Sequence, residues 1–505
     1  AVGLTGWLSD TRYQGIRIYS LGTPWKGDIL DMAERQIQKG HYGLAMGLFQ
    51  EVIHSYPDAD RLLRATKGYE TAAHRESMVN NLEKWRHELE RAWPGASFEI
   101  RLDNDGLTVE ASNAGIASLE PLRELPISNL YCANNQIDTL DPLRGMPLRT
   151  LNCSGNPVKS LAPLQGMPLT SLICEGCQIS SLAPLQGLPL TLLNCGGNRL
   201  DTGLEPLRGM ALTFLGCWGN QLTQLDPIQG MPLTALYCGG NQITRLDPLV
   251  HMPLNVLHCS GNRIASLEPL EGTTLTALHC SDNAIENLQP LKGLPLTMFS
   301  CHSNRISDMR PLQGMPLGWL TCGRNPLTSL EPHIDNPPEM FLFASDSLSD
   351  KYLLELRRAW AEKPGMEQHV RQVDVILGVR RRDIQALKNL AVPFQGKRYL
   401  YNPYFLSWQD ARVLCEELGG HLLTIHSREE NEFITSLFPG GGWLWLGLFN
   451  HGSGPQWVTG EPYDYHCFTD VLRERLLGPK IFNGFWTRDD VPNAHNCFMM
   501  MWDEP

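Results

Sequence analysis

The chain has 505 residues, of which 42% are hydrophobic and 19% charged, and this is more chain than one compact core usually takes. The net charge of −12 at pH 7 argues against a nucleic-acid or anionic-membrane partner, because no basic face stands out. The nearest candidate, VRRRD at 379–383, is typical of the charged face of a helix. The sequence also has no apolar run of about eighteen residues that could span a bilayer.

Residues 31–63 show a helical periodicity that is interrupted at Gly40. The segment resembles a tetratricopeptide repeat, whose spacing is matched by Gly40, Tyr42, Ala45, Phe49 and Pro57. One such repeat and the helix predicted over 65–93 are too little for a full peptide-binding groove. We therefore expect residues 1–97 to form a helical N-terminal region that caps a repeat array.

Residues 98–112 predict a β-hairpin around Asn104-Asp105-Gly106, because these residue types favour tight turns between strands. The hairpin leads into the first repeat of the array. We take residues 98–335 as the second domain.

Cysteines recur every 21 residues through this domain, apart from one step of 22 where DTG at 201–203 adds a residue. A period this regular indicates a solenoid. The frame around each cysteine, L-x-x-L-x-C-x-x-N, resembles the leucine-rich repeat, with Cys in a strand position usually held by Leu. The resemblance implies an α/β solenoid with a parallel sheet. The cysteines are Cys132, Cys153, Cys174, Cys195, Cys217, Cys238, Cys259, Cys280, Cys301 and Cys322.

Strand alternation predicts which side chains enter the core. In LTALYC, Leu236 and Cys238 are two residues apart and share one face, while Tyr237 points the other way. Each turn of the solenoid buries its apolar face only when its neighbour covers it. An Asn column three residues after the cysteines, replaced by Cys177 in one repeat, is expected to bind backbone groups where the chain leaves each strand.

The cysteine column favours small apolar side chains stacked in the core, since free Cys is commonly buried. Neighbouring strands lie close enough for disulfides, but parallel side chains have the wrong Cβ geometry. A zinc site would need Cys and His pairs on one short loop. The triplet Cys280-Ser281-Asp282 suggests a nucleophile, but its register with the other cysteines indicates an inert core residue.

Aromatic and histidine side chains gather on the outward, concave side of the predicted strands. Rigid aromatic side chains suit a protein or peptide partner, because they bury large areas at low entropic cost. The alternative is a surface without a ligand, since scattered apolar surface residues are normal. A metal at His258 and His279 would need a third ligand, His302, from across the pleat. The candidate binding residues are Phe214, Trp218, Tyr237, His258, His279, His302 and Trp319.

After the array, NPPEM at 336–340 is expected to end the periodicity. Ser349 then opens a helix, and a second helix follows it. We take residues 336–393 as a helical C-terminal cap and linker.

Residues 394–505 resemble a C-type lectin-like domain, which implies an α+β fold. Trp408 and Ala411 lead a helix to Cys415. The resemblance also rests, in chain order, on Gly419-Gly420-His421-Leu422 at the entry to a strand, Glu429-Glu430-Asn431 opening a second helix, and Trp445-Leu446-Gly447-Leu448 as the core segment.

The sequence departs from this family where calcium is commonly held. The calcium-binding tripeptide falls at Val491-Pro492-Asn493, so its acidic ligand is absent, and Asn493 alone stays a candidate ligand-binding residue. No Trp-Asn-Asp strand motif follows. The family's partners of Cys415 and Cys497 are missing, and Cys467 has no counterpart. We therefore predict no cofactor, with calcium kept as an alternative whose usual ligands are largely absent.

These features predict a non-catalytic recognition or scaffold protein, since no Ser-His-Asp set, P-loop, HExxH or Gly-rich nucleotide motif occurs. Its expected partners are a protein or peptide on the concave face and, at the lectin-like domain, a glycan or second partner. One alternative is calcium-dependent glycan binding and another is a structural adaptor. The domain combination is also similar to the non-kinase part of large bacterial serine/threonine kinases, a sensing region. A column of free cysteines favours a bacterial cytoplasm, whereas the C-type lectin-like family is often extracellular and disulfide-bonded, so an extracytoplasmic location stays the alternative.

Overall fold

The computed structural model describes residues 28–55, 58–103, 105–200, 203–344, 346–437, 444–445, 448–450, 455–459 and 496–503. The chain divides into two compact units. One unit holds the residues up to 137 together with 141–151, and the other holds residues 138–140 and 152 onward.

Three helices begin the first unit: α1 (Ile29–Gln38), α2 (Tyr42–His54) and α3 (Ala59–Ala92). Asp28 caps α1 by accepting a hydrogen bond from the Leu30 N–H. The predicted interruption at Gly40 is confirmed, since Gly40 has φ 76° between α1 and α2. Phe49 of α2 packs over Gly68 of α3, where an added Cβ would lie 2.3 Å from the ring.

The predicted hairpin is confirmed as β1 (Glu99–Asp103) paired antiparallel with β2 (Gly106–Glu110). Strand β3 (Ile127–Tyr131) pairs parallel with β2 and begins the parallel series. The first unit therefore contains three helices, the hairpin and the first strand of the parallel series.

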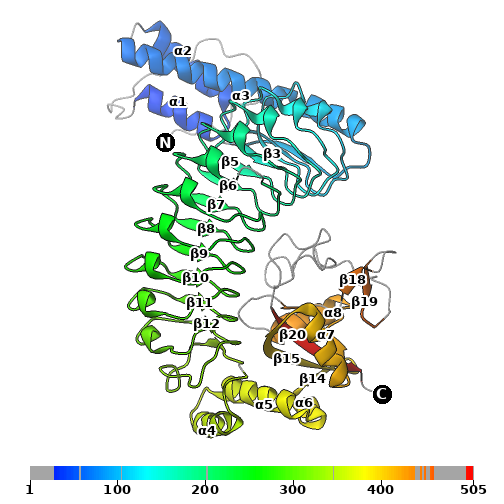
Figure 1. Ribbon diagram of the computed structural model, residues 1–505. Helices are drawn as coiled ribbons and strands as arrows, with labels where there is room; N and C mark the ends of the chain where they lie inside the picture. The colour runs from blue at the N-terminus through cyan, green and yellow to red at the C-terminus, as the bar shows by residue number, and fades with distance from the viewer. Residues whose placement is uncertain are drawn as a thin grey trace, which may run out of the picture. The chain divides into compact units, whose positions relative to one another are not determined.

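A parallel solenoid sheet makes up most of the second unit, and Figure 1 shows its strands as successive rungs. Each strand pairs in register with the next, as in Leu236 opposite Leu257. The middle residue of these strands is buried, and its neighbours face outward. The series continues from β3 with β4 (Thr150–Asn152), of which only Asn152 belongs to the second unit. The strands that follow are β5 (Ser171–Ile173), β6 (Leu192–Asn194), β7 (Phe214–Gly216), β8 (Ala235–Tyr237), β9 (Val256–His258), β10 (Ala277–His279), β11 (Met298–Ser300), β12 (Trp319–Thr321) and β13 (Met340–Leu342).

The cysteine column is stacked inside this sheet, as predicted. Each member is at most 1% exposed. Burial raises the pKa of Cys195 and Cys238 to about 12, so these thiols stay protonated and inert. The column serves packing, and the described residues hold no disulfide within it.

The asparagine column binds the backbone as predicted. Asn241 donates from Nδ2 to the carbonyls of Cys217 and Cys238 at 3.1 and 3.0 Å. Its Oδ1 accepts from the Leu222 N–H at 2.9 Å. Cys177, which replaces Asn in one repeat, still directs its thiol at the Cys153 carbonyl at 3.4 Å. Each side chain thus joins two successive turns of the solenoid.

Short 3-10 helices return the chain to the next strand. Nine of the ten start on a residue that is followed directly by Pro-Leu, and the tenth has Pro-Ile, which suits a proline fixed in the first helical turn. They span Glu120–Leu122, Asp141–Leu143, Ala162–Leu164, Ala183–Leu185, Glu205–Leu207, Asp226–Ile228, Asp247–Leu249, Glu268–Leu270, Gln289–Leu291 and Arg310–Leu312.

The strand series runs past its predicted end at residue 335. Strand β13 pairs with β12, so Leu320 lies opposite Phe341. Phe343, which stands 21 residues after Cys322, takes the place of the cysteine and is fully buried. The sequence prediction was wrong here because Phe replaces both Leu and Cys of the repeat frame.

The helices α4 (Asp350–Ala361), α5 (Glu367–Arg381) and α6 (Ile384–Leu390) follow. Ser349 caps α4 through the Tyr352 N–H, as its sequence predicted.

A chain of buried rings joins the last strand to these helices, with successive centroids 5.1 to 5.8 Å apart. Its members are His333, Phe341, Phe343, Trp360 and His369. These aromatic contacts cover the final turn of the solenoid, so that its core is not left open to water.

The C-terminal part is an α+β fold in which β20 is the central strand. It pairs antiparallel with β15 and β16 and parallel with β17. Ser407 caps α7 by accepting from the Asp410 N–H. The elements are β14 (Val392–Phe394), β15 (Lys397–Leu406), α7 (Trp408–Glu417), β16 (His421–Leu422), α8 (Arg428–Leu437), β17 (Leu444–Trp445), β18 (Leu448–Asn450), β19 (Pro455–Trp457) and β20 (Asn496–Asp503).

Candidate functional site

The structure brings four of the predicted side chains into one stack on the outer sheet face, the face turned away from the cysteine column. The ring centroids of Phe214 and Tyr237 are 5.4 Å apart, those of Tyr237 and His258 6.0 Å, and those of His258 and His279 5.4 Å. We name these four residues the aromatic stripe. All four are half-buried, so each keeps part of its surface open on this face.

The stripe follows from the repeat register. Tyr237, His258 and His279 hold the same position of three successive strands, which the parallel pairing places side by side. Phe214 comes from another position of β7 and reaches Tyr237 because its strand has Gly216 at the stripe position. Strand alternation therefore predicted that these side chains lie on the outer sheet face. Gly216 leaves the space into which the Phe214 ring leans toward Tyr237.

Trp218 lies beside the stripe and turns backward along the sheet. Its Nε1 donates to Oε1 of Glu175 at 3.0 Å, across the intervening repeat. Gly196 makes this possible, because an added Cβ there would lie 2.1 Å from the Trp218 Nε1. Sequence reasoning missed Glu175 and Gly196. Both follow a column cysteine directly, as Trp218 does. An alignment of the repeats therefore places these three residues at the same position of successive repeats.

The two histidines of the stripe are neutral at pH 7. Desolvation, with the nearby His279, lowers the pKa of His258 to about 4. Desolvation also lowers the pKa of His279. The stripe therefore presents uncharged rings, which is the state that stacks against an apolar or aromatic partner group.

The other predicted residues that the structure describes, His302 and Trp319, make no ring contact with the stripe among the described residues. His302 is 8% exposed and holds its Nδ1 3.9 Å from an Asp282 oxygen, which leaves its ring little surface for a partner. Trp319 is half-buried at the edge of β12, and its buried Nε1 has no hydrogen-bond partner in the described part of the chain. Asn493 lies outside the described residues. No cluster of three or more metal-binding side chains occurs among the residues that the structure describes.

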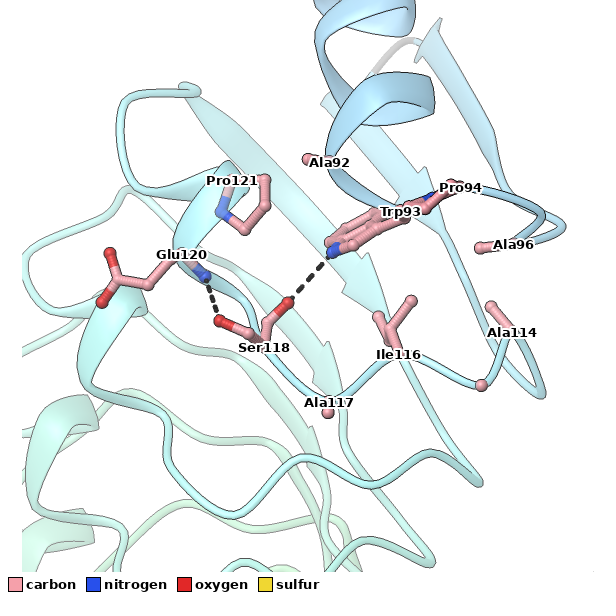
Figure 2. A pocket seen from close by; sticks show the side chains of 11 residues that line it. Ala92, Trp93, Pro94, Ala96, Ala114, Ile116, Ala117, Ser118, Glu120 and Pro121 are labelled. Atoms are coloured by element: carbon pink, nitrogen blue, oxygen red, sulfur yellow. Dashed lines mark hydrogen bonds between the residues drawn. The ribbon is translucent and has the colours of Figure 1, made fainter.

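A cavity of about 470 Å³ lies in the first unit, beside Trp93 (Figure 2). The Trp93 Nε1 donates to the Ser118 carbonyl at 3.1 Å, and Figure 2 shows the indole along one wall. Its titratable lining residue is Glu120, whose pKa is lowered by hydrogen bonds from Arg123. The walls are otherwise small or apolar, so the cavity offers little chemistry. The lining residues are Ala92, Trp93, Pro94, Ala96, Ala114, Gly115, Ile116, Ala117, Ser118, Glu120 and Pro121.

The C-terminal fold is organised around a buried carboxylate. Glu430 of α8 is 3% exposed and accepts from Lys397 Nζ at 3.1 Å and from the Tyr399 hydroxyl. Its second oxygen accepts from the His426 N–H at 2.7 Å. The bonds from Lys397 and Tyr399 tie α8 to β15, and the bond from His426 fixes the segment that leads into α8.

This C-terminal fold matches the Lectin C-type domain over residues 405–503. Dromaiocalcin-2 of Dromaius novaehollandiae is 31% identical over 108 residues, which are 21% of this chain and 72% of that protein. The chain belongs to the C-type lectin family. Struthiocalcin-2 of Struthio camelus is 33% identical over 100 residues, covering 17% of this chain and 70% of that protein.

The C-type lectin match covers a small part of larger relatives. C-type lectin domain family 17, member A of Homo sapiens is 34% identical over 105 residues, which are 21% of this chain and 24% of that protein. The chain therefore spans about a quarter of the length of this relative.

The repeat solenoid is similar to solved leucine-rich repeat structures. The functional domain of InlJ from Listeria monocytogenes, described as including a cysteine ladder, has 28% identity and a TM-score of 0.40, covering 48% of this chain and 53% of that one. The Leptospira interrogans LRR protein LIC12759 has 19% identity and a TM-score of 0.38, covering 48% and 73%. The solenoid architecture of this C-type lectin family member rests on the strand register described above.

At the position where the C-type lectin family is expected to hold calcium, the tripeptide of this chain lacks an acidic residue. Calcium binds six to eight oxygen ligands, whereas Val491 supplies no side-chain oxygen at the tripeptide. Val491-Pro492-Asn493, Cys467 and Glu461 all lie outside the described residues. In the described part, Glu430 already accepts three hydrogen bonds, so it is engaged in the fold.

Proposed function

We propose that this chain is a non-catalytic recognition protein. Its solenoid binds a protein or peptide partner on the outer sheet face, and its C-type lectin domain takes a second ligand or partner. The observation that carries the proposal is the aromatic stripe, in which Phe214, Tyr237, His258 and His279 stack in continuous contact. Rings held by their neighbours lose little entropy when a partner covers them.

The chemistry of the chain supports a binding role over a catalytic one. Burial raises the pKa of Cys238 to about 12, and Cys280 shifts in the same direction, so these thiols are poor nucleophiles. A repeat solenoid and a C-type lectin domain are binding modules. A catalytic domain of the whole protein would lie outside these residues.

Calcium-dependent glycan binding is the alternative that the C-type lectin domain favours. Val491 at the calcium-binding tripeptide counts against it. Two further hypotheses are a structural adaptor and the sensing region of a larger bacterial kinase. In both, the stripe binds a partner.

The domain division is part of this proposal. Residues 1–97 form a tetratricopeptide-like cap, the solenoid extends from 98 to the end of β13, a helical linker follows to 393, and the lectin domain begins at 394.

A bacterial cytoplasm suits the column of buried thiols, because a reducing interior keeps thiols reduced. Among the described residues, no helix has the length and apolar character needed to cross a membrane.

Selection of random peptides on the intact chain tests the proposal. We expect peptides that bind the natural chain and lose at least about tenfold in affinity on Tyr237→Ala, which a loss of about 1.4 kcal/mol would produce. Tyr131→Ala is the matched control, since Tyr131 is half-buried on β3 outside the stripe. The proposal is contradicted if the selected peptides bind Tyr237→Ala with the same affinity as the natural chain. A parallel glycan-array measurement with and without EGTA tests the alternative, in which binding depends on calcium.

A further inference from the structure

The side chain of Trp218 is held in a preformed position on the outer sheet face. It lies across Gly196, where an added Cβ would be 2.1 Å from Nε1 and 2.3 Å from Cε2. The same Nε1 donates a hydrogen bond to Oε1 of Glu175 at 3.0 Å. The indole is half-buried, so part of it stays open on the face that carries the stripe.

The strand segments around the stripe carry acidic side chains and no Lys or Arg. The seven segments from β5 to β11, each taken from the start of its strand to the third residue beyond it, carry two carboxylates, Glu175 and Asp282, and neither Lys nor Arg. The Glu175 residue is 3% exposed and the Asp282 side chain 13%. Charges in such partly desolvated places act over longer distances than exposed ones. An acidic side chain therefore lies beyond each end of the stripe.

The bond between Trp218 and Glu175 also changes the indole itself. An N–H that donates to a carboxylate pushes electron density into the ring and makes its face more negative. Indole is already the best aromatic acceptor for a cation over its face. An electron-rich indole beside an aromatic stripe, among strand segments from β5 to β11 that carry neither Lys nor Arg, is complementary to a positively charged group that carries an apolar stem.

We propose that Trp218, backed by Glu175, receives a Lys or Arg side chain of the peptide bound on the aromatic stripe. This inference rests on the proposed function and names the chemistry of its partner. The alkyl stem of the basic residue packs along the rings, and its charged head lies over the indole face. This surface thus prefers protein or peptide partners whose sequence has a Lys or Arg next to an apolar residue.

The test uses peptides selected on the intact chain as the probe. We expect Lys or Arg to be enriched at one fixed position of the stripe-dependent peptides. One such peptide is then made with Lys and with norleucine, which has an apolar stem of similar length and no charge. We expect the exchange to weaken binding about tenfold on the natural chain, and about twofold or less on Glu175→Gln.

Two further variants separate charge from fold. Glu205→Gln removes a carboxylate from an exposed 3-10 helix, where it pairs with Arg208, and it should leave the preference for Lys unchanged. Gly196→Ala keeps every charge but displaces Trp218, and it should abolish the preference. Circular dichroism and thermal unfolding show that each variant is folded before its affinity is compared.

Each outcome decides between the two claims. Stripe-dependent peptides that bind equally well with Lys and norleucine would overturn the cation site and leave the proposed function standing. A preference for Lys that persists in both Glu175→Gln and Gly196→Ala would place the cation elsewhere and also overturn this inference. An absence of any stripe-dependent peptide would overturn the proposed function and the cation site together.

Discussion

Trp218 and Glu175 are 43 positions apart in the sequence, yet the indole Nε1 donates to the carboxylate Oε1 at 3.0 Å. Glu175 follows β5 and Trp218 follows β7, so the bond bridges the repeat of β6. That repeat has Gly196 at the crossing point, and no side chain stands between the two groups. A contact of this kind depends on three repeats together and on no single one of them.

Gly196→Ala should therefore destabilise the chain by about 1–3 kcal/mol, the usual range for a methyl group forced into a packed site. The added Cβ has to push the indole away from Glu175, since the backbone of Gly196 is not left-handed and strain there does not contribute. The measurement is the denaturation midpoint in urea.

Gly318→Ala is the control for this variant. Gly318 also has an ordinary backbone, and its added Cβ would meet a single backbone oxygen at 3.9 Å. We expect a change within about 0.5 kcal/mol there. Equal effects of the two variants would mean that Trp218 is not held by Gly196.

Much of this architecture could be predicted because it is periodic. The spacing of the cysteines predicted the strand that ends before Cys238. The alternation along this strand predicted that Leu236 and Cys238 enter the core while Tyr237 lies on the outer sheet face. Local rules also held for the caps, as at Ser349. Such features depend on residues within one repeat or one helical turn.

The contacts that cross repeats could not be predicted in the same way. Trp218 reaches Glu175 because of a glycine in between, and strand β13 continues the sheet with Phe343 where the pattern has Cys. His302 was expected to face a partner, but it turns toward Asp282 and is buried. Side-chain direction on an open sheet face depends on the size of its neighbours, which a repeat consensus does not record.

Cys238→Ser should reduce the free energy of unfolding by about 1–3 kcal/mol, because it places a hydroxyl where the described core offers apolar neighbours. Cys238 is fully buried in the cysteine column. Thermal unfolding by circular dichroism gives the comparison. Ser260→Ala is the control, because Ser260 is a half-buried residue two positions after His258. We expect it to change the melting temperature little. An unchanged melting temperature for Cys238→Ser would show that the column tolerates polar groups.

Asn241→Leu should be more damaging, because it removes five hydrogen bonds of a residue that is 8% exposed. Each buried backbone group left without a partner costs about 1–3 kcal/mol, so we expect a loss of more than about 3 kcal/mol. Asn255→Ala replaces an exposed Asn in the turn before β9 and should have an effect within about 0.5 kcal/mol. The idea that the Asn column joins the repeats fails if both variants unfold at the same urea concentration.

The C-terminal end of the solenoid should be sensitive to acid through His333. Burial lowers the pKa of His333 from 6.5 to about 4, and the residue is 7% exposed beside Phe341. Because the folded pKa lies below the unfolded one, the unfolded chain takes up the proton first as the pH falls. The stability that the neutral ring contributes is complete above pH 6.5 and is lost progressively down to about pH 4.

His333→Phe removes this titration and keeps an aromatic ring against Phe341. Since one pKa unit corresponds to about 1.4 kcal/mol, we expect the natural chain to lose up to about 2 kcal/mol more than the variant between pH 6.5 and pH 5. Urea denaturation at these two pH values measures the difference. His74→Gln, at an exposed position of α3, should keep the slope of the natural chain. If His333→Phe keeps that slope as well, the acid sensitivity arises from other groups, and the covering of the last repeat does not depend on a neutral imidazole.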